Sequence, residues 1–590
     1  VGNLKKKYDG PLDQMSRAGW AGSVDSIGKV WGAVAWVYDK RGRLKADTSW
    51  TGPVARVTTR AYDTYERPVT MNDALGAWTT KYETERGIPD TLITPWSDTL
   101  SYTFDSRRRP ISTRISSAAG RMARSISYTT AGELKELKHT ANPAGQSGYA
   151  ITRYERLPEP PEPDTMPGGP SLVPLWTELH GAGGALDSLR DSVVYDGWQR
   201  VNTYVRRELG GHYPLDSLTY TFDPTGNVNT PLGGEFYHKV TGRLQTRKVN
   251  SILHFYTYDR TGNLTQESWA GNTRTYQYDA LNQLRSVRHN GTLIVRYGYD
   301  VLGRRIAKRV YSSITGGTVG FTRYKYHGGH VAFETDSAGS SIGWRYTWGM
   351  GTDDLMAMRD AAGNHYYTAK DKLGSIRALA ERDGTWKYST RYGPYGEPKL
   401  GAGTDPGLRY RWTGREYDAE TGWYFHRSRY YAPTMLRFVQ EDKIGYGGGT
   451  NLYAYVAGAV LDARDPSGML MSWADIGKGF IPFCTFGGSC LGADGSVTGE
   501  GPEIYLDGVS WGGGGGGGRI SGIAIASITG AGYGSLLPGR VEGGDKVATQ
   551  LIAECRNNEA CNESIELWEA VPGGFAYVRT TVLVTDAGFS

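Results

Sequence analysis

The four cysteines all lie in the last 121 residues, in two pairs with the spacing C-x5-C. Cys484 pairs in this way with Cys490, in CTFGGSC, and Cys555 with Cys561, in CRNNEAC. In a secreted protein this pattern favours two disulfide bridges, for which four cysteines allow three connectivities. A zinc site made of all four thiolates is an alternative, although structural zinc sites use the shorter spacing C-x2-4-C. Reduced, separate thiols are the third possibility.

The same segment contains no histidine, because His426 is the last one in the chain. This excludes Ser-His-Asp and Cys-His hydrolases, HExxH proteases and His-Cys-Cys zinc deaminases built from this segment alone. GxSxG is absent, and glycines 512–518 precede Arg519 rather than the Lys-Ser/Thr of a phosphate-binding loop, which favours a flexible linker. Several acidic residues could serve a glutamate-based transferase, but their spacing singles out none of them, so solvated surface is favoured: Glu500, Glu503, Glu542, Asp545, Glu563 and Glu566.

The sequence Asp-Pro-Ser-Gly, residues 465–468, stands at a border in composition. The chain up to Met469 is rich in tyrosine and carries a net charge of +12, whereas the chain from Leu470 onward is rich in glycine and carries −7. The acidic balance argues against a C-terminal domain that grips nucleic-acid phosphates. Asp-Pro and Asp-x-x-Gly are ordinary turn sequences, so a purely structural turn is one interpretation of this border.

The elements that position these residues are expected to be β-strands. A chain of 590 residues is too long for one ordinary core, so either several domains or a long repeat structure is required. Its 82 glycines and 40 tyrosines suit many short, half-exposed strands joined by turns. The only long uncharged run is 520–539, a marginal membrane span interrupted by glycines. The first residues, VGNLKKKYDG, lack a signal-peptide core, and we expect a fragment of a larger protein.

A repeat gives the strongest signal in the sequence. Its unit is an aromatic residue or Tyr-x-Tyr before Asp, then two residues, a turn former, a polar residue and an aliphatic one. Tyr-x-Tyr places both rings on one face of a strand, and Asp with Gly forms the turn into the next strand. One such hairpin cannot bury its own face, so the repeats predict a long, continuous sheet. The units are YDKRGRL at Tyr38, YDGWQRV at Tyr195, YTFDPTGNV at Tyr220, YTYDRTGNL at Tyr256, YQYDALNQL at Tyr276 and YGYDVLGRR at Tyr297.

These units resemble the RHS or YD repeats, and residues 371–468 resemble the RHS-repeat-associated core that ends such arrays. The match is specific over the last hundred residues of this region and loose before residue 195. The matching stretches are DKLGSIRALAERDG (371–384), YGPYGEP (392–398), RWTGREYDAETGWYFHRSRYY (411–431), RFVQED (437–442) and NLYAYV with DPSG (451–456 and 465–468).

The resemblance implies a mainly β fold in which a coiled sheet forms a hollow, cocoon-like shell. Residues 1–370 would be the repeat shell, residues 371–469 the core that seals one end, and residues 470–590 a variable, polymorphic toxin-like domain of uncertain fold held inside. A filled β-solenoid, or a set of ordinary β-domains, is the alternative architecture. No metal or cofactor is expected.

The resemblance also implies an aspartyl autoprotease in the core, with Arg429, Asp442 and Asp465 as its residues and cleavage between Met469 and Leu470. Two adjacent carboxylates cannot both ionise, so one keeps a proton while the other activates water, and an arginine offsets the developing charge. The sequence departs from the family pattern in two places: Lys443 replaces the usual Pro, and Ala432 replaces the usual Asp.

The leading functional hypothesis is a secreted or cell-surface bacterial protein that encapsulates and delivers its own C-terminal effector. An immunity protein, a secretion apparatus and missing N-terminal segments are the further partners implied, and no nucleic acid is expected to bind the shell. Two alternatives remain: a membrane-active segment at 520–539, and an uncleaved, adhesive surface protein whose aspartates are only structural.

Overall fold

The computed structural model describes residues 33–469 with short gaps and, beyond them, only short strand segments. The gaps are 39–42, 52–53, 74, 84–87, 108, 118–119, 131–133, 142–147, 157–171, 182–183, 199, 209–213, 232, 301–302, 313–315 and 400. The later segments are 472–473, 490–491, 497–498, 562–571, 574–585 and 588–589.

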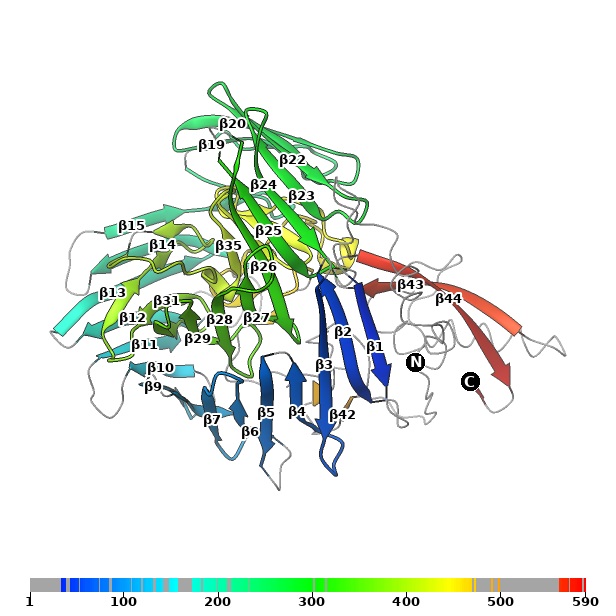
Figure 1. Ribbon diagram of the computed structural model, residues 1–590. Helices are drawn as coiled ribbons and strands as arrows, with labels where there is room; N and C mark the ends of the chain where they lie inside the picture. The colour runs from blue at the N-terminus through cyan, green and yellow to red at the C-terminus, as the bar shows by residue number, and fades with distance from the viewer. Residues whose placement is uncertain are drawn as a thin grey trace.

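Two antiparallel sheets of fifteen strands each make up the body, and within each sheet every strand pairs with its neighbours in sequence (Figure 1). The first sheet contains β1 (Ala33–Tyr38), β2 (Leu44–Thr51), β3 (Val54–Tyr62), β4 (Pro68–Asp73), β5 (Gly76–Tyr82), β6 (Pro89–Ile93), β7 (Thr99–Phe104), β8 (Pro110–Ser117), β9 (Gly120–Tyr128), β10 (Leu134–Ala141), β11 (Gly148–Arg156), β12 (Leu172–Gly181), β13 (Gly184–Tyr195), β14 (Val201–Glu208) and β15 (Pro214–Thr219). The second contains β18 (Phe236–Tyr237), β19 (Leu244–Val249), β20 (Ile252–Tyr258), β21 (Leu264–Trp269), β22 (Asn272–Tyr278), β23 (Leu284–His289), β24 (Thr292–Tyr299), β25 (Arg305–Tyr311), β26 (Thr318–His327), β27 (His330–Thr335), β28 (Ile342–Trp348), β29 (Leu355–Asp360), β30 (His365–Lys370), β31 (Ile376–Ala380) and β32 (Trp386–Ser389).

Smaller sheets complete the described structure, and no α-helix occurs within it. Likewise, no helix in these parts of the chain is long and apolar enough to cross a membrane. The smaller strands are β16 (Thr221–Phe222), β17 (Val228–Asn229), β33 (Arg391–Tyr392), β34 (Pro398–Lys399), β35 (Glu416–Asp418), β36 (Trp423–His426), β37 (Arg429–Ala432), β38 (Arg437–Phe438), β39 (Ala463–Arg464), β40 (Ser472–Trp473), β41 (Cys490–Leu491), β42 (Val497–Thr498), β43 (Asn562–Val571), β44 (Gly574–Thr585) and β45 (Gly588–Phe589). Three short 3-10 turns are η1 (Trp412–Gly414), η2 (Gly445–Gly448) and η3 (Val456–Gly458).

The Tyr-Asp unit folds as a hairpin because its aspartate closes the turn. The Asp259 amide donates to the Asn263 carbonyl at 3.0 Å, and the Asp259 carboxylate accepts the Asn263 amide at 2.9 Å. Gly262 supplies the positive φ of +79° that the turn requires. The same closure recurs at Asp279 and Asp300. The predicted repeat of hairpins is therefore confirmed, and with it a mainly β chain.

The turn also forms where the repeat is hard to recognise in the sequence. The Asp63 carboxylate accepts the Arg67 amide at 2.9 Å and pairs with its guanidinium at 2.7 Å. Asp105 and Arg109 repeat both contacts. The aspartate and the residue four positions later thus define the unit better than its tyrosines do.

The region resembling the associated core packs against both long sheets. Tyr424 and Tyr455 share one hydrophobic cluster with Val193 and Tyr204 of the first sheet. On the other side, Trp423 and Phe425 cluster with Tyr276 and Tyr297 of the second sheet. In Figure 1 the yellow strands of this region accordingly lie between the cyan strands β13–β15 and the green strands β22–β25.

The two long sheets also meet directly. Leu100 and Ile115 of the first sheet pack with Tyr367 of the second in a further cluster. Beside it, Asp98 is 1% exposed and accepts a hydrogen bond from the Thr347 hydroxyl at 2.5 Å. The first sheet therefore turns back onto β28–β31 of the second.

Burial raises the pKa of Asp98 to about 6, although the Thr347 hydroxyl partly opposes the shift. Because the folded chain then holds this proton more tightly than the unfolded chain, the free energy of unfolding should fall as pH rises from about 4 to about 6. Asp98→Asn should remove this pH-dependent part of the free energy of unfolding, which amounts to at most about 3 kcal/mol. Urea denaturation at pH 4.5 and 7.5 measures it. An equal pH dependence in both proteins would contradict this origin.

Candidate functional site

The three polar residues singled out in the sequence are carried by different short segments of the core region. Arg429 begins β37, Asp442 follows β38, and Asp465 directly follows β39. Strand β37 is a middle strand of the four-stranded sheet β35–β38, which fixes Arg429 rigidly in the interior. Asp442 and Asp465 lie on turns outside this sheet, so their positions depend on the contacts that those turns make.

The structure brings all three side chains together. One nitrogen of Arg429, Nη2, lies 2.7 Å from Oδ2 of Asp442 and 3.4 Å from Oδ2 of Asp465. The three side chains are 3%, 6% and 4% exposed, respectively. A single guanidinium thus faces two buried carboxylates. The arginine also lies over the ring of Phe438, 3.7 Å from its centroid, which fixes its plane.

Asp465 uses its two carboxylate oxygens differently. Oδ1 accepts the amides of Gly468 at 2.8 Å and Met469 at 3.1 Å, and the hydroxyl of Ser467 at 3.0 Å. These are the contacts of an ordinary Asp turn, which is one of the two interpretations given above for residues 465–468. Oδ2 faces Arg429 instead. Asp465 can therefore close the turn through Oδ1 and take part in acid–base chemistry through Oδ2.

Four consecutive residues, His426–Arg429, bind the carbonyls of four consecutive residues, Asp465–Gly468. In each pair the two residues are 39 positions apart, so this contact fixes the register of the border segment. The pairs are His426 Nδ1 with the Asp465 carbonyl at 2.6 Å, Arg427 Nη1 with that of Pro466, Ser428 Oγ with that of Ser467 at 2.5 Å, and Arg429 Nε with that of Gly468. We call this contact the carbonyl clamp.

Gly468 lies where the carbonyl clamp leaves no room for a side chain. Its φ is +73°, and an added Cβ would lie 2.3 Å from the His426 carbonyl oxygen and 3.1 Å from the Arg429 amide nitrogen. Both are backbone atoms that are paired within the sheet. Glycine is therefore required here both by conformation and by space.

Burial raises the pKa of both carboxyl groups. The pKa of Asp442 rises to about 6 because of burial, with Arg429 opposing the shift and Asp465 adding to it. Burial also raises the pKa of Asp465, against the opposing effect of Arg429. Two carboxylates beside one guanidinium carry an excess negative charge unless one of them is protonated. The arrangement therefore favours a proton held by the pair up to about pH 6.

The two departures from the family pattern do not remove the pair. Lys443 directs its ammonium to the carbonyl of Leu281, at 3.1 Å, and burial lowers its pKa to about 8. The pKa of Asp442 is raised, whereas a lysine held against its carboxylate would lower it. Ala432 is completely buried at the end of β37.

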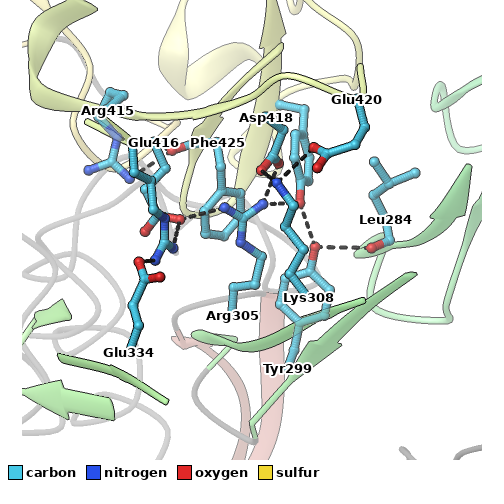
Figure 2. A network of polar contacts seen from close by, with 12 residues as sticks. Leu284, Tyr299, Arg305, Lys308, Glu334, Arg415, Glu416, Asp418, Glu420 and Phe425 are labelled. Atoms are coloured by element: carbon cyan, nitrogen blue, oxygen red, sulfur yellow. Dashed lines mark hydrogen bonds and ion pairs between the residues drawn. The ribbon is translucent and has the colours of Figure 1, made fainter. Parts of the chain in front are cut away.

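A buried polar network beside this site joins the four-stranded sheet to the second long sheet (Figure 2). Arg305 of β25 has no exposed surface and lies 2.5 Å from Glu416, and it also pairs with Asp418. Lys308 reaches Asp418 at 3.0 Å, and Tyr430, next to Arg429 in sequence, bonds to Arg305 at 3.2 Å. Strand β37 is therefore anchored on the repeat sheet by charge as well as by packing.

Some predicted residues lie outside what the structure describes. Met469 is the last residue described before the border, whereas Leu470, Cys484, Cys555, Cys561 and the run 520–539 are not described. Of Cys490, only the backbone in β41 is described. In the described parts of the chain, no three or more His, Cys, Asp or Glu side chains gather as metal ligands would.

His426, Arg427 and Ser428 were not predicted as site residues. All three stand in the stretch HRSRYY, but only Arg429 was given a role. Their partners lie 39 residues away, and no periodic signal links segments at such a distance.

Parts of this chain are similar to a known family and to known proteins. Residues 195–448 match the family described as Teneurin YD-shell. The chain is 28% identical over 280 residues to the tRNA3(Ser)-specific nuclease WapA of Bacillus spizizenii, a match that covers 45% of this chain and 11% of that protein. It is 27% identical over 361 residues to the toxin protein Tse5 of Pseudomonas aeruginosa, which covers 49% of this chain and 27% of that protein. The chain therefore spans well under half the length of these relatives.

Among solved structures, the crystal structure of TcdB2-TccC3 aligns with 76% of this chain and 27% of its own, at 16% identity and a TM-score of 0.44.

Proposed function

Because the chain belongs to the RHS/YD-repeat shell proteins, we propose that it encloses its own C-terminal segment and releases it by self-cleavage between Met469 and Leu470. Residues 1–370 form the wall of the shell, residues 371–469 its plug and protease, and residues 470–590 the cargo. Two sheets of fifteen consecutive strands, with the core region packed between them, support a closed wall.

The observation that carries the proposal is the position of Arg429 between two buried carboxylates, beside a border segment held by the carbonyl clamp. The pair Asp442 and Asp465 holds one proton. Its ionised member takes a proton from a water molecule, whose oxygen bonds to the Met469 carbonyl carbon. The protonated member stabilises the carbonyl oxygen, and Arg429 balances the negative charge that develops. The carbon–nitrogen bond to Leu470 then breaks, and the nitrogen of Leu470 receives the proton that the pair took from the water, which returns the pair to its starting state.

The proximity of the reacting groups comes from folding alone. Because Asp465 Oδ1 binds the Met469 amide at 3.1 Å, the peptide unit next to the scissile bond is fixed relative to the dyad. Such an intramolecular arrangement removes most of the entropic cost of bringing the groups together. The reaction needs no cofactor and takes place once in each chain.

The cargo is proposed to be a toxin, since the relatives bear the names of a nuclease and a toxin. Secretion from a bacterium, and an immunity protein that protects the producing cell, follow from the same proposal. The cargo has its own activity, and its lack of histidine restricts that activity to chemistry built on other residues.

Asp465→Asn is the test. The parent chain should run as two fragments on a denaturing gel but elute as one species under native conditions, because the cargo stays inside. Asp465→Asn should give one chain, with cleavage reduced at least 100-fold, as expected when a group that acts on the reacting atoms is lost. Asp462→Asn is the matched control, because Asp462 binds Lys372 at 2.7 Å and not the dyad. If Asp465→Asn is cleaved at the parent rate, the proposed protease mechanism is wrong. If the two fragments of the parent separate under native conditions, the C-terminal segment is not enclosed by the shell.

A further inference from the structure

We propose that Arg427 is a positioning residue that makes the cleavage depend on completion of the second long sheet. The proposal rests on the self-cleavage proposed above and adds its regulation. Arg427 lies in the two-residue turn between β36 and β37, next to the border segment and facing a loop of the repeat sheet. It therefore joins three parts of the molecule that are far apart in sequence.

The guanidinium of Arg427 contacts both the repeat sheet and the border segment. Nη2 lies 2.6 Å from Oδ1 of Asp353, and Nη1 lies 3.2 Å from Oδ2 of the same residue. Nη1 also donates to the Pro466 carbonyl. The backbone of Arg427 adopts a φ of +61°, which is unfavourable for a residue with a Cβ. The fold thus maintains an uncommon backbone conformation at the residue that makes this connection.

Asp353 is a fixed anchor on the repeat sheet. It lies in the loop between β28 and β29, is 2% exposed, and also binds Arg415 at 2.8 Å. Burial opposes its ionisation, yet the Arg415 and Arg427 guanidiniums hold its pKa well below the ordinary range. Asp353 therefore presents a permanent negative charge, and Arg427 is oriented by it whenever this loop is in place.

The other carboxylate of the dyad is anchored at a different place on the same sheet. Gln440 donates to the Asn282 carbonyl at 2.5 Å, and Lys443 to the Leu281 carbonyl at 3.1 Å. Both carbonyls belong to the turn between β22 and β23, whereas Asp353 lies between β28 and β29. The turn between β22 and β23 thus positions Asp442. The loop that contains Asp353, about 70 residues further on, positions Asp465 through Arg427.

The dyad is therefore fully positioned only when both turns face the core region at the same time. This requires β22–β29 to be paired and coiled around it. Cleavage then occurs only after the second long sheet is complete. The C-terminal segment is therefore not released from an incompletely folded chain. No separate sensor is needed, because the catalytic geometry itself depends on the sheet.

The test uses the full chain made by cell-free synthesis, with cleavage followed on denaturing gels after synthesis is stopped. Arg427→Met should slow cleavage at least 10-fold. Its side chain is 34% exposed, and Asp353 keeps its pair with Arg415 at 2.8 Å, so the variant should still fold. Arg427→Lys should give an intermediate rate, because one ammonium retains a charge but cannot bind Asp353 and Pro466 with the same fork. Arg304→Met is the control, since it removes a similar ion pair, with Asp300, at a repeat turn away from the border segment.

A second measurement separates positioning from folding. In the uncleavable Asp465→Asn background, Arg427→Met should lower the thermal midpoint no more than the control Arg304→Met does, since each variant removes one partner of a buried aspartate. Cleavage of Arg427→Met at the parent rate, or a thermal midpoint clearly below that of Arg304→Met, would overturn the positioning role. A parent chain that never cleaves, or Asp465→Asn that cleaves normally, would instead remove the proposed function itself.

Discussion

Gly468→Ala is expected to abolish self-cleavage while leaving the long sheets intact. The added Cβ would lie 2.3 Å from the His426 carbonyl oxygen and 2.9 Å from the Ser428 hydroxyl oxygen. Because real Cβ atoms do not approach other atoms so closely, the border segment must leave the carbonyl clamp. The Met469 amide then loses its place beside the dyad, and misplacement by about 1 Å is enough to cost about 100-fold in rate.

Gly291→Ala is the matched control for this substitution. Gly291 has a similar φ of +80°, but an added Cβ meets nothing within 4 Å. It therefore reproduces the conformational penalty of about 1 kcal/mol without the steric clash. The fraction of cleaved chain, read by intact mass one hour after synthesis, should be near zero for Gly468→Ala and unchanged for Gly291→Ala. Normal cleavage of Gly468→Ala would mean that the carbonyl clamp does not position the scissile bond.

Arg305→Met is expected to be the most destabilising substitution in the repeat sheet. It leaves Glu416 and Asp418 buried with one partner fewer each, and it removes the hydrogen bond to Tyr430. Breaking a buried ion pair from one side costs about 3–5 kcal/mol, because the remaining charge stays in the interior. Since Tyr430 is next to Arg429, cleavage should fall as well.

Lys387→Met provides the comparison on an exposed pair. Lys387 lies 3.2 Å from Glu381, with 43% and 38% of the two side chains exposed. Such pairs contribute about 0–1 kcal/mol, so this variant should unfold at nearly the parent urea concentration. Urea denaturation followed by tryptophan fluorescence measures both variants. If Arg305→Met lost no more stability than Lys387→Met, the network in Figure 2 would be dispensable.

The sheet was predictable from sequence because its signals are local. Asp259 and Gly262 make a complete turn within five residues, and successive turns imply successive hairpins. The turns at Asp63 and Asp105 were not recognised, because the prediction relied on tyrosines rather than on the residue four positions after the aspartate. The contact between the two sheets at Asp98 and Thr347 joins residues 249 positions apart, and no local pattern encodes it.

The site was only partly predictable. Arg429, Asp442 and Asp465 were named from a family resemblance, and their meeting at one guanidinium depends on the turns that anchor each segment. The carbonyl clamp and the buried charges of Figure 2 were missed, because arginine and glutamate in a strand ordinarily indicate a solvated face. Arg305 and Asp418 are 113 residues apart, and only the coiling of the sheet brings them together.

The most direct test of self-release is the intact mass of the full chain, purified and denatured without added protease. The account predicts two species, one that ends at Met469 and one that begins at Leu470, in equal amounts. A single species of 64.7 kDa that persists on long incubation would contradict self-cleavage. Asp442 and Asp465 would then be only structural parts of the core.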